Sequence, residues 1–412
     1  MGVKSGRKRM AALLAALMLP LAACAAGEDA RPLAGDGREI LTVASVGAQP
    51  GLDYLCAAFN AQSGEYYARI VEYGYEPDAD AAPERLATEL IAGRGPDIVA
   101  ASGGNSLMQE AKDSGAFLEL TPLLGELAPG LVPAVAEALR ERPEIYDLPE
   151  NFGITSFLAH PSQTGGRLGL TMEEAEACAA ALGGGCGVFQ QWMTREELYK
   201  RAMDDATGRY IDFGAGTCSF EDPGYIALLE LCAACPAEPQ GYENGGCLLM
   251  SYPLTGVEQL CTLARLYGDD YCFMGFPQEG EGRRGWLERR ASTCFSVSAA
   301  GNTEGALEFI RFALSYERQA LVETGFPVDQ AALDALFAAA LDGEYSQGTL
   351  AQRDVDAFYE LLNSGLSFSE RPDAVTLIMM EEARTFFAGG ATAQEAAHRT
   401  QERVSLYLAE QA

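Results

Sequence analysis

The sequence predicts an α/β protein built from two large lobes. Its 412 residues are 48% hydrophobic and 21% charged, values typical of a globular chain long enough for two cores. No period of about 20 to 50 residues repeats along it, which disfavours solenoids and propellers. From Ile40 onward, apolar strand-like segments alternate with amphipathic helical segments, and no Ser/Pro-rich linker divides the chain. These observations favour two α/β lobes joined by several short crossings.

The N-terminal segment resembles a bacterial export signal. Four basic residues among the first nine precede an apolar run from Met10 to Leu21. That run is too short to cross a hydrocarbon core of about 30 Å, so we expect residues 1–23 to form a cleaved signal peptide. The sequence Leu-Ala-Ala-Cys at its end resembles the lipobox of bacterial lipoproteins, in which Cys24 takes a diacylglycerol. A plain secretory cleavage site with an incidental cysteine is the alternative.

The remaining chain is strongly acidic. The whole sequence has 29 Lys and Arg against 59 Asp and Glu, and loss of the four N-terminal basic residues changes its formal charge from −30 to −34. Such a surface repels phosphate backbones, so we expect no nucleic-acid partner. Two acyl chains on Cys24 would tether the protein to the membrane. Residues 24–37, rich in Ala, Gly and Asp, are expected to be a flexible stalk.

The first hundred residues alternate between strand and helix. Apolar and β-branched residues predict strands at 40–44, 67–73 and 97–101. Apolar residues at helical spacing predict helices at 52–59 and 86–91, and Gly93 suits the end of the second one. A strand-helix-strand-helix-strand order predicts a parallel sheet with helices on both faces.

Helix-start signals continue this pattern through the middle of the chain. Thr171 and Thr194 are each followed three residues later by Glu, which predicts a capping box at the start of a helix. Asp222 followed by Pro223 predicts another start. Residues 294–297 are expected to form a strand and 306–314 a helix. The last 60 or so residues are expected to be helical, ending with a helix at 395–410.

The cysteine and histidine content limits the chemistry. Ten cysteines follow Cys24, and Cys232 and Cys235 form a close pair without a second pair beside it. This pattern favours buried thiols or local disulfides over a zinc site. His160 and His398 are the two histidines, and no Gly-x-Ser-x-Gly motif is present, so hydrolytic chemistry is disfavoured. Residues 280–285 match Gly-x-Gly-x-x-Gly but open no apolar helix, which indicates a loop.

Several short motifs follow one another in order along residues 40–412. They are Leu90–Val99 with its Gly-Pro-Asp-Ile core, Gly115–Thr121, Thr194–Leu198, Phe220–Pro223, Gly275–Pro277, Ser298–Phe312, Gly325–Val328 and Phe387–Glu410. Together with the export signal and lipobox, this order resembles that of the family 1 extracellular solute-binding proteins. Members of that family are lipoprotein receptors of ABC importers, most of which take up sugars.

The resemblance implies a two-lobed periplasmic-binding-protein-like fold with a ligand cleft and a hinge between the lobes. Carried over to this sequence, lobe 1 is residues 38–147 with 291–341, and lobe 2 is residues 148–290 with 342–412. Two regions depart from the family. Residues 172–187 resemble an inserted helix with a Gly/Cys-rich turn, and the region after Asn151 lacks the usual Tyr-Tyr-Asn strand. The family's substrate class is therefore not carried over residue by residue.

The resemblance also implies a function and a location. We expect a solute-binding protein, anchored by lipid on Cys24 to the extracytoplasmic face of the cell membrane, that delivers a small solute to ABC permease subunits. A carbohydrate is the first expectation, and amino acids, peptides and cations are alternatives. We expect no cofactor, no metal and no catalytic residue. A receptor that reports to a membrane sensor is the alternative function, and a secreted hydrolase or lyase is less favoured.

Ligand-binding residues are expected where parallel strands end, because loops there line such a cleft. These candidates are Ser45 and Gly47 after the first strand, and Ser102, Gly103 and Asn105 after the third. Aromatic faces that stack on sugar rings are a second group, with Tyr252, Trp286 and Tyr345 as candidates. For each aromatic residue, packing in the core is the alternative.

Overall fold

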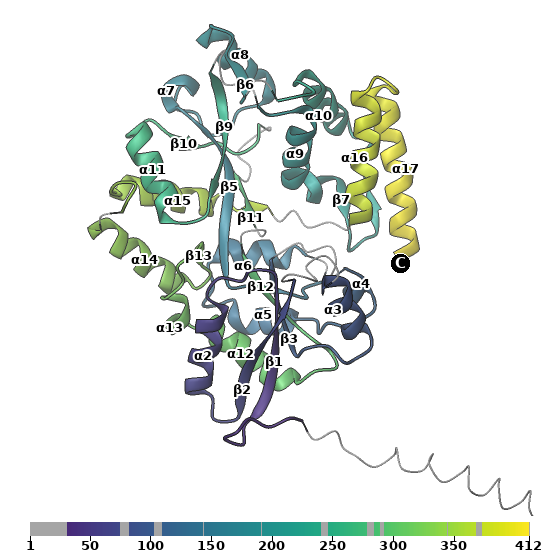
Figure 1. The fold of residues 1–412 in the computed structure, drawn as a ribbon. Coiled ribbons are helices and arrows are strands. Elements are labelled where there is room, and N and C mark those ends of the chain that lie inside the picture. Colours follow the sequence, from purple (N-terminus) through teal and green to yellow (C-terminus); the bar gives the residue numbers. More distant parts are fainter. Residues whose placement is uncertain are drawn as a thin grey trace, which may run out of the picture.

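The computed structural model divides the chain into two lobes, one below the other in Figure 1. It describes residues 31–74, 82–102, 109–142, 144–190, 192–239, 246–277, 284–288, 292–343, 345–367 and 373–411. Cys24, the signal peptide and the first part of the expected stalk lie outside these residues. In the part of the chain described, none of the helices has the length and apolar character needed to cross a bilayer.

A five-stranded sheet forms the centre of the lower lobe, in the order β2-β1-β3-β12-β4. The strands are β1 (Glu39–Val46), β2 (Tyr66–Tyr73), β3 (Ile98–Ser102), β4 (Leu148–Pro149) and β12 (Thr293–Val297). β1 is parallel to β2 and β3, which confirms the predicted parallel arrangement, while β12 is antiparallel to β3 and β4. β4 extends two residues beyond the predicted limit of lobe 1 at residue 147.

Helices cover both faces of this sheet because β1 is apolar on both sides. Leu41 and Val43 belong to the core formed with α2 and α12, whereas Ala44 and Val46 belong to a smaller core with α3 and α4. The helices of this lobe are α2 (Leu52–Gln62), α3 (Ala82–Ile91), α4 (Gln109–Asp113), α5 (Thr121–Leu127), α6 (Pro133–Arg140), α12 (Thr303–Ala313) and α13 (Tyr316–Gln319).

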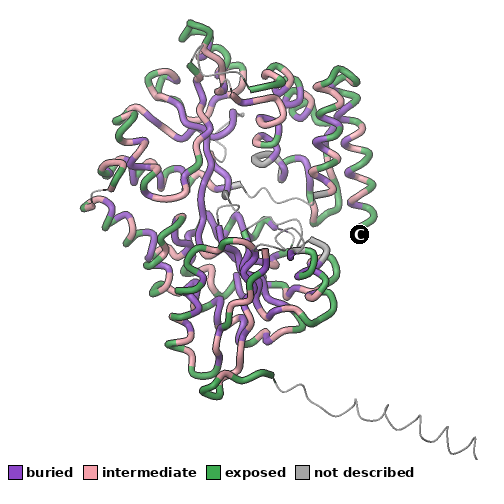
Figure 2. The backbone as a smooth tube through the Cα atoms, viewed as in Figure 1, coloured by how far each residue is buried: buried purple, intermediate pink, exposed green. Residues whose placement is uncertain are grey.

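The strand β5 (Asn151–Ala159) passes from the lower lobe into the upper one, as Figure 1 shows. It occupies the region where the sequence lacks the family's strand motif. All nine of its residues are buried, so it shows no alternation between apolar and polar positions. Figure 2 shows this buried strand along the middle of the molecule.

The sheet of the upper lobe has the order β14-β11-β5-β9-β6, and β10 and β13 also pair with β5. The strands are β6 (Gly187–Phe189), β9 (Cys247–Leu254), β10 (Cys272–Phe273), β11 (Gly285–Glu288), β13 (Phe326–Pro327) and β14 (Leu366–Ser367). A separate two-stranded sheet is formed by β7 (Ile211–Asp212) and β8 (Thr217–Cys218). β13 lies within residues 291–341, which the sequence assigns to lobe 1, but it pairs with β5, so the predicted boundary at residue 341 differs from the structure.

The predicted helix starts of the upper lobe are confirmed. Thr171 and Glu174 form a reciprocal capping box, Thr194 accepts from the backbone of Glu197, and Asp222 caps the next helix. The helices are α7 (Pro161–Thr164), α8 (Met172–Leu182), α9 (Arg195–Tyr210), α10 (Pro223–Ala234), α11 (Val257–Tyr267), α14 (Gln330–Asp342), α15 (Gln352–Asn363), α16 (Asp373–Phe387) and α17 (Ala393–Gln411).

Residues 31–37, which the sequence assigns to the flexible stalk, bond to the lower lobe. The backbone N–H of Ile40 donates to the carbonyl of Pro32 at 3.0 Å, and Leu33 forms a β-bridge with Glu39. Arg31 donates to the carbonyl of Gly301 at 3.1 Å. These contacts attach this segment to the lower lobe, so the expectation that residues 31–37 belong to a flexible stalk is not met.

The ten cysteines after Cys24 all lie in described parts of the chain, and no disulfide joins any two of them. Cys232 at the end of α10 is fully buried, and burial raises its pKa well above the ordinary value. Cys235 is partly buried, and its pKa is raised for the same reason. Of the two expectations from the sequence, the structure has buried thiols at this pair.

Candidate functional site

The carboxyl-terminal edge of the lower sheet points toward the upper lobe (Figure 1). β2 and β1 end side by side at Tyr73 and Val46, and Ser102 at the end of the adjacent β3 pairs with Thr293. The backbone N–H of Glu150 donates to the carbonyl of Thr293 at 2.8 Å. The edge therefore runs in one row across the sheet, and at Glu150 the chain continues directly into β5.

Two predicted ligand residues, Ser45 and Gly47, form hydrogen bonds in the turn after β1. The backbone N–H of Gly47 donates to the carbonyl of Tyr73 at 2.8 Å, and its φ of 69° is a left-handed conformation that favours glycine. The Ser45 hydroxyl donates to the carbonyl of Gly47 at 3.1 Å, and Ser45 is only 3% exposed. Ser45 therefore stabilises the turn after β1 through its side chain.

A further hydrogen bond, not anticipated from the sequence, joins the turn after β1 to β12. The Gln49 amide donates to the carbonyl of Val46 at 2.8 Å and accepts from the Thr293 hydroxyl at 2.9 Å. These bonds hold the turn across the end of β3. Ser102, the predicted residue at that end, is exposed and lies between the two bonded segments. Ser102 is therefore accessible at this edge of the sheet.

Glu150 is the titratable group at the end of this row, and the sequence analysis did not identify it. Burial raises its pKa to about 7, against an opposing influence from the positive charge of Arg318. Near neutral pH its carboxyl is therefore present in both protonation states, and the protonated form donates one hydrogen bond while also accepting. The only sequence signal was one acid between two apolar strand segments.

Replacing Glu150 with glutamine is expected to remove a pH-dependent penalty on folding. The folded-state pKa is raised above the ordinary value of 4.5, so stability present at low pH is lost as the pH rises toward about 7. Glu150→Gln should unfold with wild-type stability near pH 4 and be more stable by about 1 to 3 kcal/mol at pH 8. Urea unfolding at both pH values measures this difference.

The control for that experiment is Glu323→Gln, at an exposed position after α13. It should leave the pH dependence of unfolding unchanged. If Glu150→Gln gave the same stability difference from wild type at pH 4 and pH 8, the buried carboxyl would not be the cause.

Trp286, one of the three predicted aromatic platforms, is buried in the upper lobe. It lies on β11 opposite Thr155 of β5 and is 3% exposed. Its ring lies 6.0 Å from that of Phe157 at 55°, within the core cluster that also contains residues of α9, α10, α16 and α17. Trp286 is therefore a core residue and not an exposed aromatic platform. β11 is an inner strand of the sheet, and helices cover the face on which Trp286 lies.

Tyr252 and Tyr345 lie near α11, away from the row of residues at the sheet edge. The Tyr252 hydroxyl donates to the carbonyl of Gln259 on α11 at 3.2 Å. Burial raises the pKa of Tyr345, and the nearby Cys261 and Glu258 of α11 add to this effect. Figure 1 shows α11 in the upper lobe, well above the lower sheet. Neither tyrosine therefore joins Ser45, Gly47 and Ser102 in this structure.

Three further predicted residues, Cys24, Gly103 and Asn105, lie outside the described residues. Within the ranges that the structure describes, no group of three or more His, Cys, Asp or Glu side chains is arranged to hold a metal ion. His398 is exposed on α17, and its Nδ1 donates to the Glu221 carboxylate at 2.7 Å, which raises the pKa of His398.

The two lobes approach each other where α17 lies near α4. Asp113 at the end of α4 in the lower lobe acts on the pKa of Tyr407 on α17 in the upper lobe, although burial of Tyr407 is the larger cause of its raised pKa. Figure 1 shows the C-terminal end of α17 close to α4. The C-terminal end of α17 in the upper lobe thus lies beside the lower lobe.

Comparison with solved structures shows that this architecture is that of solute-binding proteins of ABC transporters. The sugar-binding protein MalE of Xanthomonas citri matches with a TM-score of 0.63 and 15% identity, covering 90% of this chain and 98% of that one. A cyclic α-maltosyl-1,6-maltose binding protein of Arthrobacter globiformis matches with a TM-score of 0.62 and 14% identity, covering 91% and 100%.

A third match is an ABC transporter solute-binding protein of Thermotoga lettingae bound with α-D-tagatose, with a TM-score of 0.57 and 14% identity over 90% of this chain and 99% of that one. No family model matches the chain, and no curated protein sequence matches it. The chain therefore has the two-lobed, MalE-like periplasmic-binding-protein fold, and the similarity in sequence to these proteins is low.

Proposed function

We propose that this protein is a lipid-anchored, extracytoplasmic solute-binding protein that captures a carbohydrate between its lobes and delivers it to an ABC permease. The observation that carries the proposal is the two-lobed fold with the carboxyl edge of the lower sheet directed at the upper lobe. Ligands of open α/β sheets bind outside the carboxyl ends of the strands. A ligand held there would touch both lobes.

The polar groups at this edge support a hydroxyl-rich ligand. Ser102 offers an exposed hydroxyl, and the Glu150 carboxyl near its pKa of about 7 both donates and accepts. Solved structures with the same fold include a solute-binding protein bound with α-D-tagatose, one in complex with cycloalternan, and a maltose-maltodextrin binding protein. These names support sugar as the first class to test.

The N-terminal sequence supports the anchor. An apolar export signal followed by Leu-Ala-Ala-Cys is the pattern of a lipoprotein, and two acyl chains give stable membrane attachment. The acidic remainder of the chain gains no attraction from anionic lipid, so attachment would depend on the lipid itself.

Thermal unfolding in the presence of a ligand panel tests the proposal. The panel contains tagatose, maltose, maltodextrins, cyclic glucans and chitin oligosaccharides, with amino acids, dipeptides and polyamines as the contrasting classes. A true ligand at 100 times its dissociation constant should stabilise the protein by about 2.7 kcal/mol. Stabilisation by a contrasting class, with none by any saccharide, would contradict the carbohydrate assignment.

A further inference from the structure

Two of the segments that connect the lobes run side by side. One is residues 149–151, between β4 and β5, and the other is residues 325–330, which contain β13 and lead into α14. β13 pairs antiparallel with the start of β5, with Pro327 opposite Asn151. The two crossings therefore form one short ladder between the lobes.

The upper ends of both crossings are bonded to the upper lobe. Ile154 of β5 pairs with Leu254 of β9, and the backbone N–H of Gly325 donates to the carbonyl of Thr255 at 3.1 Å. Thr255 directly follows β9. Both crossings thus reach the upper lobe at the same end of β9.

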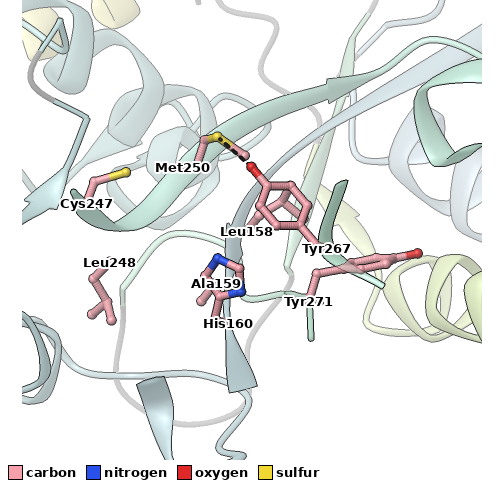
Figure 3. Close-up of a pocket in the computed structure, with 8 residues that line it drawn as sticks. All are labelled: Leu158, Ala159, His160, Cys247, Leu248, Met250, Tyr267 and Tyr271. Carbon is pink, nitrogen blue, oxygen red and sulfur yellow. Dashed lines mark hydrogen bonds between the residues drawn. The ribbon is translucent and has the colours of Figure 1, made fainter. Parts of the chain in front are cut away.

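The far end of β5 is also part of the upper lobe. Figure 3 shows Leu158, Ala159 and His160 there, around a pocket of about 90 Å³ that Met250 of β9 and Tyr267 of α11 also line. The Tyr267 hydroxyl donates to the Met250 sulfur at 3.8 Å, and the Tyr267 ring packs edge-on against His160 at 5.1 Å. From Ile154 onward, β5 is therefore held by the upper lobe.

The lower ends of both crossings are bonded by one side chain, that of Gln319 at the end of α13. It is 1% exposed. Its Nε2 donates to the carbonyl of Glu150 at 2.9 Å and to that of Ala313 at 3.0 Å, and its Oε1 accepts from the backbone N–H of Val328 at 2.7 Å. Ala313 is the last residue of α12 in the lower lobe. Gln319 therefore ties both crossings to this lobe.

Asn151 and Gly325 lie between the lower and upper bonds, and the two crossings touch there. A Cβ on Gly325, whose φ is 78°, would lie 3.0 Å from the carbonyl oxygen of Phe152 and 3.2 Å from the Cβ of Asn151. Asn151 is 7% exposed, and its Oδ1 has no hydrogen-bond partner among the described residues. No side-chain oxygen bond thus holds Asn151 to either lobe in this part of the chain.

We propose that Gln319 is a positioning residue that fixes where the lobes bend, by holding the lower ends of both crossings on the lower lobe. The bend then falls at Asn151 and Gly325, directly above the bonded residues. Because β13 and β5 stay paired only if both crossings bend at the same level, one side chain bonded to both gives a single hinge. The inference rests on the proposed function for the ligand that would drive the bending.

Gln319→Met keeps the length and unbranched shape of the side chain and removes its hydrogen bonds. Hydrogen exchange of the ligand-free protein should then be about tenfold or more faster at the amides of Glu150 and Gln330, because local opening of both crossings becomes easier. These amides donate to Thr293 and Gly130, so neither bonds to Gln319 itself. The amides of residues 154–158 should keep their wild-type protection.

The matched control is Gln401→Met on α17. The Gln401 amide also bonds two backbone groups, since it accepts from the N–H of Phe220 at 2.6 Å and donates to the carbonyl of Cys218 at 3.0 Å, but both lie in the upper lobe. This variant should lose protection near Phe220 and keep wild-type exchange at Glu150 and Gln330.

Gln319→Glu separates hydrogen bonding from packing. The protonated carboxyl has one donor and one acceptor, so it can bond to Glu150 and Val328 as the amide does, whereas the ionised carboxyl has no donor. Burial raises the pKa of the introduced group. Compared with wild type at the same pH, protection of both crossings should be retained at pH 5 and lost at pH 8.

Small-angle X-ray scattering of the ligand-free protein tests the hinge itself. Gln319→Met should have a larger maximum dimension than wild type and Gln401→Met, because more residues of each crossing are free to bend. An unchanged maximum dimension, wild-type exchange at Glu150 and Gln330, or faster exchange to the same extent throughout both lobes would overturn the proposal.

If Gln319→Met did not fold, as judged by thermal unfolding, Gln319→Glu would still decide the question, since equal protection relative to wild type at pH 5 and pH 8 would contradict the hydrogen-bonding role. Failure of the carbohydrate screen would not affect these results, because no ligand is present in either measurement.

Discussion

Replacing Trp286 with alanine is expected to lower the free energy of unfolding by about 3 to 5 kcal/mol. The indole is 3% exposed, lies 6.0 Å from the ring of Phe157 and belongs to the core of the upper lobe, so its removal leaves a cavity. Urea unfolding of the ligand-free protein measures the loss. Affinity for the ligand found in the screen, expressed per folded molecule, should stay near the wild-type value.

The comparison for this experiment is Trp192→Ala. Trp192 is only partly buried and packs at the margin of the same core, so the loss should be smaller than at position 286. Near-native stability of Trp286→Ala together with lost ligand affinity would restore the sequence-based interpretation, in which Trp286 stacks on a sugar.

Replacing Cys24 with alanine is expected to remove both the lipid and the membrane association of the protein. The thioether bond to diacylglycerol needs the Cys24 sulfur, and each buried CH₂ of an acyl chain contributes about 0.8 kcal/mol to membrane binding. Without it, the acidic chain has no electrostatic attraction to an anionic bilayer. The variant should no longer incorporate a labelled fatty acid, and membrane fractionation should no longer find it with the membranes.

Cys178→Ala is the matched control for that variant, because it removes a thiol of α8 and leaves the N-terminus intact. It should remain labelled and membrane-bound. Membrane association and labelling of Cys24→Ala at wild-type levels would contradict the lipoprotein assignment.

The elements that could be predicted from the sequence are those with a clear period or a capping residue. The strand at 40–44 and the helix at 52–59 appear as β1 and α2, and Thr171 and Asp222 begin helices as expected. Local sequence determines these features, because side chains within one turn or one strand decide them. The overall fold followed from the order of the motifs.

The features that could not be predicted depend on contacts between distant segments. β5 is buried on both faces and lacks alternation, so its sequence resembles no amphipathic strand. Trp286 is buried because β11 pairs with β5, about 130 residues earlier in the chain, and the raised pKa of Glu150 results from the same kind of burial. Ser102 lay where it was expected, since the end of a parallel strand can be located from the strand alone.

The proposed function requires that a carbohydrate binds between the two lobes and draws them together. A ligand that touches both lobes favours the closed state by its differential affinity for that state. The most direct measurement is small-angle X-ray scattering of the protein with and without the saccharide that raises its unfolding temperature, using Ser102→Trp as a variant with a blocked sheet edge. We predict that the radius of gyration falls on saturation of the wild type and stays constant for Ser102→Trp. An unchanged radius of gyration in wild type that is saturated with a bound saccharide, or equal binding by Ser102→Trp, would contradict saccharide binding between the lobes.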